Sequence, residues 1–226
     1  MRPASTITEL RETLKTRFPE AHQEKAATED PQWLSGTAFL DAFAITRGSV
    51  NEVVCPSPSS GGALLLSGLL NANARQHQKA ALIDGRDGFD PESIGTAGCR
   101  HLLWVRCHEA KEALRATDLL LRDGNLPLVI LDLQLLPHRA LKKIPNQSWF
   151  RLHHLAEQSG SVLIALTPCH VITNAYLQLS LPRHFPLDAL DDSREHLETS
   201  LRPELIRRRF TTTHQTTDRS TPQKVG

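Results

Sequence analysis

The stretch SVNEVVCPSPSSGGALLL, residues 49–66, decides the fold class. It begins as a valine-rich strand, turns through two prolines and two glycines, and ends in leucines that open a helix. A strand that leads through a glycine-containing loop into a helix is the setting of phosphate-binding loops. The stretch therefore predicts one strand–loop–helix unit of an α/β protein.

Similar short apolar runs recur along the chain, with helical segments between them. Strands are expected over residues 49–55, 80–84, 102–107, 126–133 and 161–167, and helices over 62–76, 91–97, 109–122 and 147–158. Parallel strands buried on both faces need helices as crossovers, which is the order seen here. We predict an α/β fold with a mostly parallel, doubly wound sheet flanked by helices.

The flanks of this core differ from it in composition. Residues 1–32 are expected to form an amphipathic helix, with Ile7, Leu10 and Leu14 on one face, and a polar linker. The core spans residues 33–182, and residues 183–226 form a charged C-terminal segment with a disordered end. That segment is acidic up to residue 201 and basic after it.

Overall composition narrows the class of protein. The chain has 226 residues, with 26 Lys and Arg against 25 Asp and Glu, a net charge of +1. Near-neutrality argues against a protein that mainly coats nucleic acid. The four cysteines show no CxxC spacing, and no apolar run reaches the length of a membrane helix. We expect a reduced, cytoplasmic protein without a membrane span, and no metal site, because His153, His154 and Glu157 lack a second ligand pair.

The loop after the first strand departs from the phosphate-binding pattern GxxxxGK[ST]. Aligned on Gly61, the chain has Pro56 for the first glycine, Gly62 for the lysine and Ala63 for the hydroxyl residue. Proline lacks an N–H donor, glycine supplies no ammonium, and alanine offers magnesium no hydroxyl. The residues of this degenerate loop are Pro56, Ser59, Ser60, Gly61, Gly62 and Ala63. We therefore expect neither ATP nor magnesium as a cofactor.

Three segments together carry a family resemblance. TAFLDAFAITRGSVNEVVCPSPSSGG, with Leu40, Asp41, Gly48 and Glu52, resembles the entry to the RecA recombinase core. ALIDGRDGFDP resembles the segment with the family's catalytic glutamate, and PLVILDL resembles its Walker B strand, ending at Asp132. The resemblance covers residues 33–181 and is closer to the short RecA-like proteins of the ImuA family and their SulA-like relatives. It implies a RecA-like P-loop core.

The departures from that family concern its catalytic groups. Arg86 stands where the glutamate that activates water is expected, and arginine cannot act as a base. Pro168 stands where the family has a glutamine that senses the γ-phosphate, and the second DNA-binding loop is essentially missing. The first DNA-binding loop is reduced to a short turn over residues 138–146. We therefore expect no catalytic residues.

The resemblance implies a non-catalytic accessory protein of the bacterial DNA-damage (SOS) response. It would support error-prone translesion synthesis through contacts with an ImuB-type Y-family-like protein and an error-prone DNA polymerase. Two alternatives stay open: a divergent DNA-dependent ATPase that uses Asp132 with Arg86 or Arg47 as a substitute cation, and a SulA-like inhibitor of cell division.

Several residues have two interpretations. Arg86 pairs with Asp87 in an exposed turn, or it binds a phosphate or Asp132. Trp33, Trp104 and Trp149 are core aromatics or a base-stacking platform. Weak DNA contacts are candidates at Lys142, Lys143, Arg207, Arg208 and Arg209, and the arginine run is otherwise a solvated helix end. The N-terminal helix covers its own core or mediates homo-oligomer formation.

Overall fold

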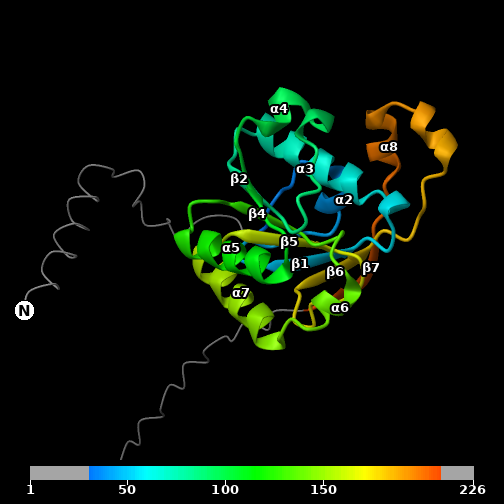
Figure 1. Ribbon diagram of the computed structural model, residues 1–226. Helices are drawn as coiled ribbons and strands as arrows, with labels where there is room; N and C mark the ends of the chain where they lie inside the picture. The colour runs from blue at the N-terminus through cyan, green and yellow to red at the C-terminus, as the bar shows by residue number, and fades with distance from the viewer. Residues whose placement is uncertain (1–30, 210–226) are drawn as a thin grey trace, which may run out of the picture.

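A seven-stranded sheet forms the centre of the computed structural model, which describes residues 31–209 (Figure 1). The strands are β1 (Val50–Val54), β2 (Ala80–Asp84), β3 (Leu102–Arg106), β4 (Leu128–Asp132), β5 (Val162–Thr167), β6 (Leu177–Ser180) and β7 (Glu204–Arg208). Their order is β3-β2-β4-β5-β1-β6-β7. All neighbours pair in parallel except β6 and β7. The predicted α/β class with a mostly parallel sheet is confirmed.

Helices cover both faces of this sheet (Figure 1). One face carries α2 (Ala38–Asp41), α3 (Gly62–Arg75), α4 (Gly95–Cys99) and α8 (Arg194–Ser200), and the other carries α5 (Ala110–Asp123), α6 (His138–Leu141) and α7 (Asn146–Ser159). Short 3₁₀ turns are η2 (Pro58–Ser60), η3 (Pro91–Ser93) and η4 (Leu187–Asp191). The five expected strands and the three long expected helices lie within two residues of their expected ends, and the helix expected over 91–97 is divided between η3 and α4.

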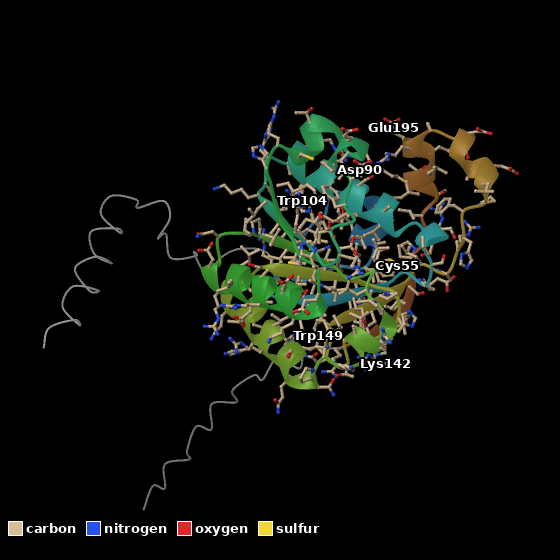
Figure 2. All side chains as sticks on the ribbon, in the orientation of Figure 1. Cys55, Asp90, Trp104, Lys142, Trp149 and Glu195 are labelled. Atoms are coloured by element: carbon tan, nitrogen blue, oxygen red, sulfur yellow. The ribbon has the colours of Figure 1, made fainter. Side chains whose placement is uncertain are left out.

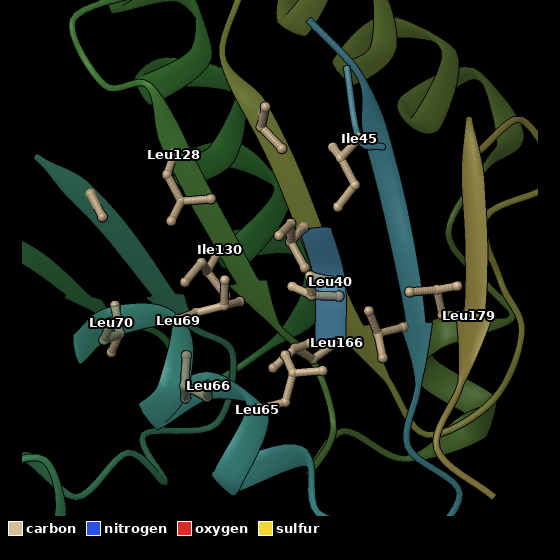
Figure 3. Packing of buried hydrophobic residues seen from close by; sticks show 14 of the residues in the cluster. Leu40, Ile45, Leu65, Leu66, Leu69, Leu70, Leu128, Ile130, Leu166 and Leu179 are labelled. Carbon is tan, nitrogen blue, oxygen red and sulfur yellow. The ribbon is translucent and has the colours of Figure 1, made fainter. Parts of the chain in front are cut away.

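The core has one layer on each face of the sheet. On one side, the leucines of α3 pack on alternate residues of the strands, among them Leu82, Ile130 and Leu166 (Figure 3). On the other side, Trp149 of α7 packs with the intervening residues, such as Leu131. Trp33 and Trp149 are buried, in agreement with core aromatics, and Trp104 packs edge-on against Phe89.

The sheet continues beyond the boundary expected at residue 182. Strand β7 pairs with β6, from Leu177 opposite Arg208 to Ser180 opposite Glu204, and Leu201 before it is buried in the core. No apolar run marks this strand in the sequence, because an edge strand has one partner and leaves charged side chains in solvent. Arg207 and Arg208 therefore lie on a strand, which corrects the expected helix end. The helix expected over 5–18, most of the linker and the tail from residue 210 lie outside the described residues.

Candidate functional site

The loop after β1 forms a tight connection into α3. The Ser60 hydroxyl donates to the carbonyl of Ser57 at 2.6 Å, which closes the 3₁₀ turn η2. Gly61 follows with a left-handed φ of +92°, and the Leu65 amide donates to the Gly61 carbonyl at 2.9 Å. The strand, loop and helix therefore adopt the arrangement that the sequence predicts.

The outer side of this loop is covered by the C-terminal segment. The Phe185 amide donates to the Ser59 carbonyl at 2.8 Å, and His184 Nδ1 lies 2.9 Å from the Ser57 hydroxyl. A Cβ at Gly61 would meet Leu201 at 2.7 Å and the Phe185 ring at 2.8 Å. The chain itself therefore closes over the loop, and only glycine fits at position 61.

The start of α3 is filled from the opposite side. A Cβ at Gly62 would lie 1.9 Å from Gln134 Oε1 and 3.0 Å from Cys55 Sγ. The same Gln134 side chain donates through Nε2 to Asp132 Oδ1 at 3.1 Å, which holds it in this position. A longer side chain at position 62 would therefore have to displace Gln134.

Two aspartates end neighbouring strands beside this loop. Asp84 of β2 lies opposite Asp132 of β4 in the sheet register. Asp84 is buried, and its two oxygens accept the amide hydrogens of the turn that follows. These donors are Arg86 at 3.3 Å, Gly88 at 3.1 Å and Phe89 at 2.8 Å. Asp84 therefore shapes this turn.

Asp132 has fewer donors and a perturbed acidity. Its Oδ1 accepts the amide of Gln134 at 3.0 Å in addition to the Gln134 side chain. Burial raises the pKa of Asp132 to about 6, and the charge of Asp84 adds to this effect. Burial also raises the pKa of the nearby Cys55 thiol to about 12, with a contribution from Asp132, so the thiol stays neutral.

The raised pKa predicts how the Asp132→Asn variant behaves. The native carboxyl titrates near 6 rather than at its ordinary 3.8, so stability is lost as pH rises from about 4 to about 6. Asparagine cannot ionise. The variant should exceed the wild type in unfolding free energy by about 3 kcal/mol at pH 7.5 and match it near pH 4.

Urea unfolding at the two pH values measures this difference. Asp123→Asn is the matched control, because Asp123 is exposed at the end of α5 and should show no such pH-dependent gain. A less stable Asp132→Asn variant at pH 7.5 would contradict the raised pKa.

Arg86 makes neither of the two ion pairs expected from the sequence, with Asp87 or with Asp132, and phosphate binding by Arg86 stays a prediction. Its guanidinium donates to the His108 carbonyl at 3.2 Å, and among residues 31–209 no ion pair joins it to Asp132. Asp87 pairs instead with Arg106, whose Nη2 donates to Asp87 Oδ2 at 2.7 Å. Arg106 also lies over the Trp104 ring, 5.1 Å from its centroid.

A cavity of about 400 Å³ opens at the carboxyl ends of β1, β2 and β4. Open α/β sheets bind ligands in this position. Its lining includes Cys55, Ala63, Asp84, Arg86, Asp90, Asp132, Gln134 and Arg194. Figure 2 labels Cys55 and Asp90, which line the cavity, and Lys142, which lies on the opposite face of the sheet. The structure thus brings together the loop, Arg86 and Asp132.

The candidate basic contacts lie apart from this cavity. Lys142 and Lys143 follow α6 and are exposed. Arg207 and Arg209 both donate through Nη2 to the Thr173 carbonyl, at 2.6 and 2.9 Å, whereas Arg208 donates to the Phe43 carbonyl. The arginine run is therefore held against two different parts of the fold.

A functional residue that the sequence alone did not reveal is Glu52, whose carboxylate lies in the middle of β1. Glu52 is fully buried, and five groups from the end of β5, from the segment after it and from β6 surround it. They are Thr167 Oγ1 at 3.1 Å, Val171 N at 2.8 Å, Ile172 N at 3.2 Å, Gln178 Nε2 at 3.0 Å and His170 Nδ1 at 2.6 Å. In the sequence, the sign of such a buried carboxylate is a charged residue within a valine-rich strand. Glu52 therefore fixes the segment between β5 and β6.

In the described part of the chain, neither a metal cluster nor a helix that could span a membrane is present. Residues 31–209 contain no group of three or more His, Cys, Asp or Glu side chains that could hold a metal ion. His153 Nε2 lies 3.3 Å from Glu157 on the surface of α7. None of the helices between residues 31 and 209 has both the length and the apolarity needed to cross a membrane.

Strand order, helical layers and the loop before α3 define an α/β protein with a RecA-like core. The crystal structure of the RadB recombinase matches with a TM-score of 0.51 and 18% identity, covering 66% of this chain and 84% of that one. The RecA proteins of Streptomyces coelicolor and Streptomyces lividans are each 31% identical over 104 residues.

That match covers 43% of this chain and 28% of each RecA protein, so the chain spans little more than a quarter of their length. No protein-family model matches the chain.

Proposed function

We propose that this protein is a RecA-fold accessory protein of the bacterial DNA-damage response that acts through protein contacts rather than nucleotide hydrolysis. One observation carries the proposal: Gln134 fills the space where a side chain at Gly62 would begin. The neighbouring Ala63 has no hydroxyl, and Phe185 and Leu201 close the loop from outside. The fold keeps the shape of a phosphate loop while the groups that bind triphosphate and magnesium are replaced.

Surfaces suited to protein contacts support this role. Leu119 on α5 and Phe150 on α7 are 59% and 57% exposed, and the two helices pack side by side. By resemblance, the partners are an ImuB-type Y-family-like protein and an error-prone DNA polymerase in translesion synthesis, within the cytoplasm. Direct DNA contact through Lys142, Lys143 and the arginine run is expected to be weak.

A thermal-shift measurement with Mg-ATP tests the non-catalytic part of the proposal. A nucleotide at 100 times its Kd would add about 2.7 kcal/mol and raise Tm by several degrees. We expect no shift for the full chain. A shift that disappears in Asp132→Ala would contradict the proposal.

The partner is tested by co-expression with the ImuB-type protein of the same organism. We expect the two to co-purify, and Phe150→Asp to weaken the complex without changing Tm. An exposed control on the opposite face of the sheet, Arg75→Asp at the end of α3, should leave the complex intact. Failure of the two wild-type proteins to associate would contradict the proposed role.

A divergent DNA-dependent ATPase is the second candidate. It is favoured by Asp132, which keeps its place at the end of β4, and by Arg86, which lines the same cavity. Phosphate release with and without single-stranded DNA separates the two functions, because stimulation by DNA is expected of the ATPase alone.

A further inference from the structure

The cavity at the carboxyl ends of β1, β2 and β4 has the dimensions of a ligand site. Its volume of about 400 Å³ falls in the range of pockets that bury small molecules or single side chains. Much of its wall is apolar. The apolar lining includes Pro56, Pro58, Leu64, Phe89, Ile94 and Leu135.

The floor of the cavity contains one carboxylate oxygen that is open to a donor. Both hydrogen bonds from Gln134 go to Asp132 Oδ1, and within residues 31–209 no group donates to Oδ2. In Asp84, by contrast, backbone amides engage both oxygens. A carboxylate oxygen without a donor in a largely apolar cavity gains most from an N–H donor, and from a cation above all.

The same cavity disfavours anions. Asp84, Asp90 and Asp132 line it, and Gln134 covers the start of α3, where backbone amides would otherwise attract a phosphate.

The lining also includes two arginines, Arg86 and Arg194. Arg86 donates to the His108 carbonyl, and Arg194 is the first residue of α8. In the described part of the chain, neither makes an ion pair with Asp132. The carboxylate therefore remains available to a cation from outside the chain.

We propose that this cavity binds a cationic nitrogen, a guanidinium or a primary ammonium, on an apolar stem. The nitrogen donates to Asp132 Oδ2, and the stem lies against the wall of Leu64, Phe89 and Ile94. This chemistry has two sources, an arginine or lysine side chain of a protein segment and a free alkylated amine or guanidine. The inference goes beyond the proposed function and does not rest on it.

Binding of n-butylguanidinium to the purified full chain, followed by calorimetry at pH 7.5, tests the chemistry. We expect saturable binding that Asp132→Asn weakens at least about tenfold, or 1.4 kcal/mol. Asp123→Asn, exposed on α5, should bind like the wild type. The unalkylated guanidinium ion should bind at least about tenfold more weakly, since it lacks the apolar stem.

A second variant tests the location without altering the carboxylate. Ile94→Trp is expected to fill part of the cavity and to weaken n-butylguanidinium binding, because Ile94 is on its wall. Thermal melts of each variant show that the fold is kept.

The peptide acetyl-Leu-Arg-Leu-amide distinguishes the two sources. Tighter binding than n-butylguanidinium supports a protein segment, and weaker binding supports a free small molecule. Absence of saturable binding of both probes, or equal affinity in Asp132→Asn, would overturn the inference. Mg-ATP binding is a separate measurement, so the proposed function and this inference can fail independently.

Discussion

Replacing Glu52 by alanine is expected to lower the free energy of unfolding by about 4 kcal/mol or more. The carboxylate is fully buried, and its removal leaves the backbone amides of Val171 and Ile172 and the hydroxyl of Thr167 without their acceptor. Each buried donor left unpaired costs about 1–3 kcal/mol. Urea denaturation at neutral pH measures the loss.

Two further variants separate the acceptor role from the size of the side chain. Glu52→Gln keeps the volume but brings an NH₂ group toward existing donors, so a smaller loss is expected. His170→Ala removes one donor from a half-exposed side chain and should cost less than about 1 kcal/mol. A Glu52→Ala loss smaller than that of His170→Ala would show that the carboxylate does not anchor the segment after β5.

The second large effect is expected from placing lysine at Gly62. The new Cβ would lie 1.9 Å from Gln134 Oε1, so Gly62→Lys has to displace Gln134 from its hydrogen bond with Asp132 and should destabilise the protein by about 1–2 kcal/mol. Shortening the obstructing side chain in Gly62→Lys/Gln134→Ala should recover most of this loss. The expected coupling energy between the two positions is more than about 1 kcal/mol.

A double-mutant cycle of urea unfolding measures this coupling. Ala63→Lys is the matched control, because Ala63 is exposed in the same turn of α3 and should tolerate lysine. Additive effects of the two substitutions would show that Gln134 moves aside freely. The space at the start of α3 would then be open to a ligand.

The fold could be predicted because its signals are local. An apolar run such as LVILD predicts a strand from its own residues, and the proline and glycine residues before α3 predict a turn in the same way. The site could be predicted only in part. The differences from the GxxxxGK[ST] pattern at Gly62 and Ala63 can be read in the sequence, whereas the positions of Gln134, Phe185 and Leu201 against the loop depend on tertiary packing.

The edge strand β7 and the buried hydrogen-bond partners of Glu52 were the hardest features to predict from the sequence. Strand β7 lacks a continuous apolar run because it pairs on one side alone, so its charge suggested a solvated segment. Glu52 belongs to a strand that is otherwise typical of a core, and its five neighbours come from residues more than 100 positions later. No local pattern announces such partners.

The position of β1 in the sheet affects how the chain can fold during synthesis. Its neighbours are β5 and β6, with Val50 opposite Leu163 and Asn51 opposite Leu177. Pairing strands that lie so far apart in the sequence requires the closure of a long loop, and a high contact order slows folding. On the ribosome, β1 must wait with both edges unpaired until the last third of the chain has emerged. The nascent chain is therefore a natural client for chaperones, and translation that stops before β6 leaves a product prone to aggregation.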